Sequence, residues 1–217
     1  GLRTSQRGIV AHCVIGPGRL GSALLAALNA SGQSVVAVGV RCAGSEDRAS
    51  SPPFLDSTSA VAATLATGAA TKVLWLTVPD DAIAAVAGQT ATASQPRGRV
   101  AVVHCSGLCD LNTLEPWRRV GAEVLSLHPL QTFAGSEGEA QRLNGIPIAV
   151  TAVSATARQL GEQLVNTIGG RAFLVPESAK PLYHLAATVA SNLFVALQSQ
   201  ASELLRQAVN SADLEQA

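Results

Sequence analysis

Three glycines with the spacing of a phosphate-binding loop are the clearest chemical signal in this chain. They belong to the run Gly16-Pro17-Gly18-Arg19-Leu20-Gly21, between a short apolar segment, residues 9–15, and a segment with helical spacing of Leu and Ala. Such glycines permit a tight turn, a close approach of the backbone to a pyrophosphate, and close packing of helix on strand. The helix start then offers free N–H groups to the anion. The run predicts dinucleotide binding, and a tight turn without a ligand is the alternative.

Arg41 is the candidate for reading the adenosine ribose of the dinucleotide. It stands 20 residues after Gly21 (41 − 21), at the end of the next strand-like run, where NAD enzymes usually place an acidic residue. A guanidinium suits the 2′-phosphate of NADP, so we expect NADP rather than NAD. Glu46 and Asp47 lie further on and weaken this preference, and an ordinary exposed loop arginine is the alternative.

Several further candidates follow predicted strands, where ligands of open α/β sheets bind. Val78 and Pro79 follow the strand at residues 72–78 and are expected near the nicotinamide, with Asp80 as the cap of the next helix. The Ser106 hydroxyl could bind a substrate carboxylate or carbonyl, or it could close a Ser-Gly turn. His128 precedes Pro129, which favours an extended backbone there, and its imidazole suits proton exchange with a carbonyl or imine.

A second group of polar residues lies on a predicted C-terminal helix. Helical spacing places His184 near Ser191, with Asn192 beside them and Lys180 one turn earlier. A cleft between two domains would supply the partners that such residues need when buried. Lys180 and Asn192 are therefore candidate site residues, and His184 shares with His128 the expected proton transfer. A solvated lysine and plain helix packing are the alternatives.

Metal binding and serine-hydrolase chemistry are not expected. Cys105 and Cys109 have the spacing Cys-x₃-Cys without a second pair, which does not match common zinc sites. His104 on a strand reads as a buried structural imidazole. The Gly-x-Ser-x-Gly elbow of hydrolases is absent from the sequence.

Strand-like and helix-like segments alternate up to about residue 175. This alternation predicts an α/β fold with a doubly wound, mostly parallel sheet, a Rossmann domain over residues 1–175. Residues 177–209 contain no glycine and read as one long helix or a broken pair, so residues 176–217 are expected to begin an all-helical domain. Residues 41–56 read as a loop. Association of two copies through the C-terminal helix is expected, although its apolar face could instead pack on the chain's own sheet.

Composition narrows the function classes. Fifteen basic and fifteen acidic residues give zero formal net charge, which argues against nucleic-acid binding. No run of 18 apolar residues exists, which argues against a membrane span. Four scattered cysteines favour a reducing compartment, and we expect the cytoplasm. The sequence contains no Met, which we interpret as a processed or trimmed product.

The chain resembles the 6-phosphogluconate-dehydrogenase-like superfamily of Rossmann oxidoreductases, relatives of pyrroline-5-carboxylate reductase and prephenate dehydrogenase. It is most similar to Rossmann-like proteins with a C-terminal helical domain of unknown function. The motifs that carry the resemblance are GPGRLG at 16–21, TVPDDAI at 77–83, HCSG at 104–107, HPLQTF at 128–133, and Lys180-x-x-Tyr183-His184 followed by Ser191-Asn192. Relatives continue with more helices, so the resemblance implies that the helical domain is incomplete here.

The resemblance also implies roles for individual residues. It places Val78 and Pro79 near the nicotinamide and Ser106 on the substrate side. His128 corresponds to a histidine that contacts the substrate oxygen in prephenate dehydrogenases, and Lys180 and Asn192 match a substrate-binding or proton-donating pair. The sequence thus predicts an NADP-dependent oxidoreductase that transfers a hydride between the nicotinamide and a small carbonyl or imine. A non-catalytic NADP-binding sensor and a scaffold without a ligand are the alternatives.

Overall fold

The structure is a computed structural model that describes residues 10–41, 51–94, 96–133 and 143–209. Its strands are β1 (Val10–Ile15), β2 (Ser34–Val40), β3 (Phe54–Asp56), β4 (Thr71–Leu76), β5 (Arg99–His104), β6 (Glu123–Pro129), β7 (Pro147–Ala152) and β8 (Arg171–Leu174). Its α-helices are α1 (Arg19–Ala30), α2 (Ser57–Leu65), α3 (Asp80–Thr92), α4 (Glu115–Arg119), α5 (Ala155–Thr167), α6 (Lys180–Thr188) and α7 (Phe194–Ala208). Short 3₁₀ turns cover Leu111–Leu114 and Glu177–Ala179, and a π-helical turn, Val189–Leu193, joins α6 to α7.

One eight-stranded sheet organises the chain. Its order is β3-β2-β1-β4-β5-β6-β7-β8, and its first six strands are parallel with the Rossmann order 3-2-1-4-5-6. The β6–β7 pair alone is antiparallel among the described strand pairs. The sheet confirms the predicted doubly wound, mostly parallel fold. The carboxyl ends of β1, β4, β5 and β6 therefore meet at one edge, where the candidate site must lie.

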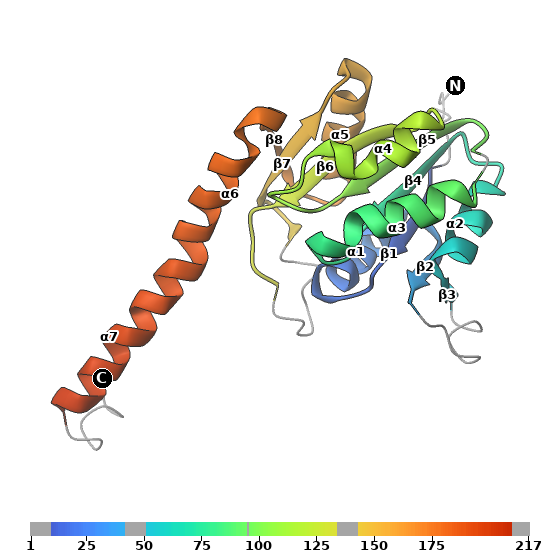
Figure 1. Cartoon of the computed structure of the whole chain (residues 1–217). Coiled ribbons are helices and arrows are strands. Elements are labelled where there is room, and N and C mark those ends of the chain that lie inside the picture. Colours follow the sequence, from blue (N-terminus) through green and yellow to red (C-terminus); the bar gives the residue numbers. More distant parts are fainter. Residues whose placement is uncertain (1–9, 42–50, 95, 134–142, 210–217) are drawn as a thin grey trace, which may run out of the picture.

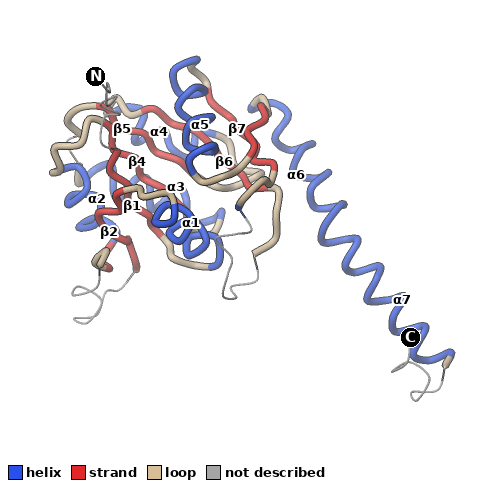
Figure 2. Tube along the Cα trace, turned by 180° about the vertical axis from the view of Figure 1, so that it is seen from behind, coloured by secondary structure: helices blue, strands red, loops and turns tan. Residues whose placement is uncertain are grey.

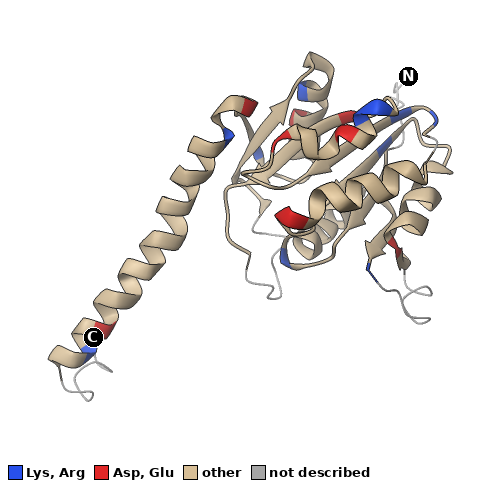
Figure 3. Ribbon diagram, in the orientation of Figure 1, with Lys and Arg blue, Asp and Glu red and all other residues tan. Residues whose placement is uncertain are grey.

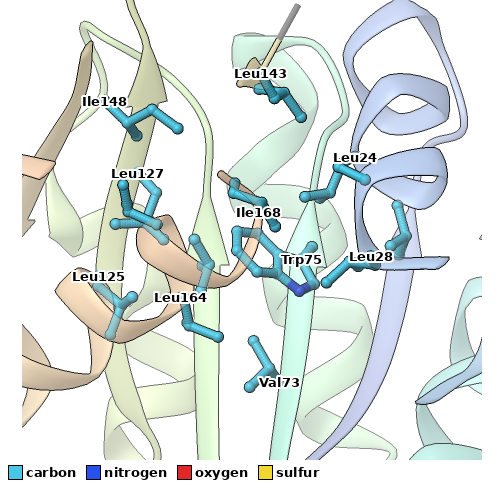
Figure 4. Packing of buried hydrophobic residues seen from close by; sticks show 14 of the residues in the cluster. Leu24, Leu28, Val73, Trp75, Leu125, Leu127, Leu143, Ile148, Leu164 and Ile168 are labelled. Atoms are coloured by element: carbon cyan, nitrogen blue, oxygen red, sulfur yellow. The ribbon is translucent and has the colours of Figure 1, made fainter. Parts of the chain in front are cut away.

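Successive side chains of a strand point to opposite faces of the sheet, and here both sets are apolar. Helices therefore cover both faces of the sheet. Val73 and Trp75 of β4 pack with Leu24 and Leu28 of α1, and leucines of α5 complete this layer (Figure 4). Leu74 of the same strand instead packs toward α2, α3 and α4 on the other face. With few aromatic residues available, both cores consist mainly of Ala, Val, Leu and Ile.

The C-terminal helix projects from the α/β body as one long rod formed by α6, the π-helical turn and α7 (Figures 1 and 2). Only Lys180, its first residue, is buried. Of the two predicted alternatives, one long helix and a broken pair, the structure has the long helix, whereas the boundary at residue 176 between two domains stays a prediction. No helix in the described part of the chain combines the length and apolarity that a membrane crossing requires.

Several local predictions were wrong. Residues 54–56, predicted as loop, form the edge strand β3, and the short helix α4 was not predicted. Pro79, not Asp80, is the N-cap residue of α3, because the Asp80 carboxylate accepts a hydrogen bond from Ser106 instead. Glu46 and Asp47, which bear on the NADP preference, lie outside the described residues, as does Cys42.

Two histidines are completely buried within strands. His12 of β1 accepts a hydrogen bond at Nδ1 from the indole N–H of Trp75, 3.1 Å away, and His104 of β5 accepts one from the backbone N–H of Ser106. The Nε2 atoms of both rings lack a partner among the described residues. Burial lowers the pKa of His12 to about 4 and that of His104 to about 3. Both rings are therefore neutral at pH 7, and His104 behaves as the structural imidazole that was predicted.

These pKa values predict an acid-sensitive fold. An unfolded histidine titrates near 6.5, so between about pH 6.5 and 4 the unfolded chain binds a proton that folded His12 does not. The stability that His12 contributes is complete above pH 6.5. It is lost as the pH falls, by about 1.4 kcal/mol per pH unit. Urea unfolding measured at a series of pH values will show the sum of this slope and the slopes that the other buried histidines add in the same way.

His12→Asn isolates the contribution of one ring, because the amide oxygen can still accept the Trp75 N–H and cannot titrate. The free energy of unfolding of this variant should fall less steeply between pH 6 and 4.5, by about 1.4 kcal/mol per pH unit. Equal slopes for the two proteins would contradict the assignment.

Candidate functional site

The glycine-rich loop has the geometry that its sequence predicts. Gly16 has a φ of +90°, which only glycine adopts without strain, and its N–H donates to the carbonyl of Gly39 at the end of β2. A Cβ on Gly21 would lie 2.2 Å from the Gly16 carbonyl oxygen. Thr77, just after β4, donates its hydroxyl to that same oxygen at 2.7 Å. Loop, helix and adjoining strand are thus held too closely for a side chain at Gly16 or Gly21.

The start of α1 is open where an anion would bind. Gly18 is the N-cap residue, and its side of the loop is empty because a Cβ there would meet no atom within 4 Å. The cap provides no side-chain hydrogen bond, so the first-turn N–H groups of Arg19, Leu20 and Gly21 receive no acceptor from the cap. A helix start with free N–H groups and its positive dipole end fits a pyrophosphate.

Arg41 lies at the same edge of the sheet as this loop. It is exposed and directly follows β2, and the hydrogen bond between Gly16 and Gly39 joins the end of β2 to the loop. The ends of β1 and β2 are therefore adjacent, as a ribose contact requires. Val78, after β4, packs against Gly16, and Pro79 next to it is exposed. These positions agree with a ligand lying across β1, β2 and β4.

Ser106, after β5, closes a turn. Its hydroxyl donates to Asp80 Oδ2 at 2.7 Å and accepts the backbone N–H groups of Leu108 and Cys109. The single hydroxyl proton is thus donated within the protein, and the side chain is buried. The Ser-Gly turn, one of the two alternatives for this residue, is present, and a direct contact of Ser106 with substrate stays a prediction.

Lys180 is buried, although it is the first residue of α6 and carries a charge. Only 2% of the residue is exposed, and its Nζ donates to the Ser106 carbonyl at 2.9 Å and to the Ser126 hydroxyl at 2.8 Å. Burial lowers the pKa of this ammonium, and Cys109, Glu177 and Asp80 oppose the shift. The alternative of a solvated lysine is wrong. Lys180 joins α6 to the turn after β5 and to the middle of β6.

The structure brings His128, Tyr183 and His184 together over Gly107. His128 Nδ1 and the Tyr183 hydroxyl are 2.7 Å apart, and the rings of His128 and His184 meet edge to face with their centroids 6.5 Å apart. A Cβ on Gly107 would lie 2.9 Å from His128 Nε2 and 3.0 Å from His184 Nδ1, so only glycine fits beneath the two imidazoles. Burial lowers the pKa of His128 to about 4, with the Lys180 charge as the second cause.

A cleft of about 550 Å³ opens beside this cluster. Its polar walls include His128, Tyr183 and Ser191, and its apolar walls include Leu130 and Phe173. Phe173 occupies the same cross-strand row as His128, because Ala149 of β7 pairs with both. A pocket of this size, with a few polar groups on mainly apolar walls, is typical of a small-molecule site.

Not every predicted site residue reaches this cleft. His128 lines it and His184 contacts His128, whereas Ser106 and Lys180 lie beneath them in the buried network. Asn192 is exposed and is not one of the residues that line the cleft. Tyr183 was not predicted as a site residue, and its position one helical turn after Lys180 and next to His184 was the available signal. The catalytic and cofactor roles of all these residues stay predictions.

Comparison with known families agrees with this geometry. Residues 4–129 match the model of the Rossmann-like domain, which covers the glycine loop and the first six strands. Residues 146–217 match a domain of unknown function, DUF2520, which includes Lys180, Tyr183 and His184. A search of curated proteins found no match.

Solved structures share the fold at low sequence identity. Protein TM1727 from Thermotoga maritima is 23% identical with a TM-score of 0.62, and the alignment covers 94% of this chain and 72% of that one. An imine reductase from Aspergillus terreus, solved with NADPH4 and dibenz[c,e]azepine, is 14% identical with a TM-score of 0.65, covering 94% and 69%. An NADH-preferring ketol-acid reductoisomerase from an uncultured archaeon is 17% identical with a TM-score of 0.65, covering 91% and 62%.

These likenesses concern the fold, because the identities are all below 25%. The family match is independent of them and covers more than half of the chain. With its phosphate-loop geometry and its strand order, the chain belongs to the Rossmann-like domain family, and its residues 146–217 match the DUF2520 domain that follows.

Proposed function

We propose that this chain is an oxidoreductase that binds NADP in preference to NAD and acts on a small carbonyl or imine. The observation that carries the proposal is the glycine loop, in which the N–H groups at the start of α1 have no side-chain cap and the space beside Gly18 is open. The likeness to NADPH-bound and NADH-preferring enzymes supports a nicotinamide dinucleotide as the ligand.

The bound nicotinamide would supply or accept a hydride, and the protein would supply orientation and a proton. His128 and His184 lie together at the end of β6, one strand beyond β5, and are the proposed route for that proton. With its pKa lowered to about 4, the His128 ring is neutral at pH 7 and can either accept or donate a proton. Lys180 and Ser106 act in this proposal as positioning residues.

Gly18→Ala tests the anion site without disturbing the fold. The added methyl group meets no atom within 4 Å, so the variant should unfold at the same urea concentration as the parent protein. It occupies the space through which the pyrophosphate approaches, so the Kd for NADPH and for NADH should each rise about tenfold or more. Calorimetric titration measures both constants. Gly68→Ala, at an exposed and equally open glycine far along the chain, is the matched control and should leave both unchanged.

Arg41→Ala tests the preference between the two cofactors. A guanidinium bound to the 2′-phosphate contributes about 1.5–3 kcal/mol, so its removal should raise the Kd for NADPH about 10- to 100-fold. NADH has no 2′-phosphate, and its Kd should change little. Arg41→Lys should recover only part of the NADPH affinity, because an ammonium cannot form the bidentate contact. A parallel loss of both cofactors would refute the assigned role of Arg41.

We also propose that the C-terminal helix associates with a second copy of the chain. Leu185, Val189, Leu193 and Leu197 follow one another at steps of four residues and are each about half exposed or more. A rod with such a stripe requires a cover in water. The lack of any Asp, Glu, Lys or Arg from residue 181 to residue 202 favours an apolar partner surface.

Sedimentation equilibrium tests this association. The chain should sediment with the mass of two copies, and Val189→Glu with Leu193→Glu should reduce it to one, because charges in an apolar interface are left unpaired. Leu204→Glu places the same charge at an exposed position near the end of the rod. The mass of this variant shows whether the interface extends that far. A monomeric parent chain at micromolar concentrations would contradict the proposal.

A further inference from the structure

We propose that the cleft beside His128 binds an uncharged molecule with an apolar ring or chain, and that Tyr183 donates a hydrogen bond to its carbonyl or imine atom. The proposal rests on the oxidoreductase function above and names the substrate class for it. Two independent observations carry it, namely the chemistry of the cleft walls and the geometry of the His128–Tyr183 pair.

The described walls of the cleft are mainly apolar, and their polar side chains carry no formal charge at pH 7 apart from any on a histidine. Leu130, Phe173 and three alanines, Ala186, Ala187 and Ala190, form much of the surface. None of the described residues that line it is Asp, Glu, Lys or Arg. Figure 3 shows no charged residue along the middle of the rod formed by α6, the π-helical turn and α7. The charged residues of this rod lie near its two ends. A substrate that enters this cleft meets no opposite charge on the described walls.

The nearest lysine does not provide that charge. The Lys180 ammonium is buried and already donates to the Ser106 carbonyl and the Ser126 hydroxyl, and it is not part of the cleft wall. His128 does line the cleft, but its ring is neutral at pH 7. A carboxylate or phosphate placed here would lose its hydration without gaining a paired cation, which costs several kcal/mol. An uncharged molecule avoids this cost and gains from the apolar walls.

The His128–Tyr183 pair supplies one oriented polar group. Their 2.7 Å contact can be made in two ways, with either the phenol or His128 Nδ1 as donor. When Nδ1–H donates to the phenol oxygen, the phenol proton is free to point into the cleft. A carbonyl oxygen or an imine nitrogen needs a donor of this kind. The Tyr183 ring is held by edge-to-face contacts with Phe173 and His128, so its hydroxyl is preoriented.

Proton balance follows from the same pair. As the substrate carbon gains a hydride, the phenol O–H bond breaks and its proton goes to the carbonyl oxygen or imine nitrogen. As the phenol oxygen takes the Nδ1 proton of His128, Nε2 takes a hydronium proton from the solvent, so the ring stays neutral and changes tautomer. Proton exchange with the solvent then restores the Nδ1–H tautomer, and each turnover consumes one solvent proton. The reverse reaction returns each proton along the same path. Burial raises the pKa of Tyr183 to about 12, so the phenol is protonated at neutral pH, as a donor must be.

Tyr183 is the only tyrosine in the chain, and this permits a direct test. Full-length protein labelled with 3-fluorotyrosine gives a single ¹⁹F resonance, which reports from the cleft itself. Two ketones of the same shape serve as probes, 4-isopropylcyclohexanone and 4-oxocyclohexane-1-carboxylate. We expect the neutral ketone to shift the resonance saturably, with a Kd at least about tenfold lower than that of the carboxylate.

Two variants separate a charge effect from general affinity for apolar compounds. Ala187→Arg places a cation on the cleft wall and should reverse the preference toward the carboxylate. Leu182→Arg adds the same charge to the same helix at a residue that is 71% exposed and outside the cleft, and it should leave the preference unchanged. In calorimetry, Tyr183→Phe should weaken binding of the neutral ketone severalfold and preserve the ring contacts.

Tighter binding of the carboxylate to the parent protein, or no shift with either ketone at millimolar concentration, would overturn the inference. Titration of the same sample with NADPH separates this failure from failure of the cofactor proposal. NADPH binding without ketone binding would refute only the substrate class, whereas ketone binding without NADPH binding would refute only the cofactor proposal and would leave the cleft as an uncharged-ligand site.

Discussion

The buried ammonium of Lys180 is the contact on which the arrangement of the candidate site depends. It donates to a backbone carbonyl after β5 and to a hydroxyl of β6, and it is the only buried residue of the helix that it begins. A buried cation is retained only where such acceptors surround it. Because Tyr183 and His184 follow within one turn, this contact also sets where they lie relative to His128.

Much of the fold could be predicted because its signals are local. The glycine spacing, the apolar strand runs and the helical periodicity all act within a few residues, so the sequence predicts five of the six parallel strands and the loop before α1. The predictions failed where long-range contacts decide. Residues 54–56 become a strand only because β2 offers a free edge, and Asp80 leaves its capping position because Ser106, 26 residues away, competes for its carboxylate.

The candidate site was predictable only in part for the same reason. Helical spacing could place Lys180 and His184 on one helix, but it could not show that Lys180 turns inward to Ser126 or that Tyr183 meets His128 across 55 residues. Gly107 has no special φ, and its importance lies in the two imidazoles above it, which no sequence pattern reveals. Asn192 lies on the expected helix, within its π-helical turn, but it is exposed and is not one of the residues that line the cleft.

The rod that follows Lys180 acts mechanically as a lever fixed at one end. From residue 180 to residue 208 it rises about 42 Å at 1.5 Å per residue. A tilt of about 5° at the fixed end would therefore displace its far end by about 4 Å, and Tyr183 by only about 0.4 Å. A movement of the distal end is therefore about tenfold smaller where it reaches the 2.7 Å contact between Tyr183 and His128. A displacement of that size changes the length of a hydrogen bond while the helix stays intact.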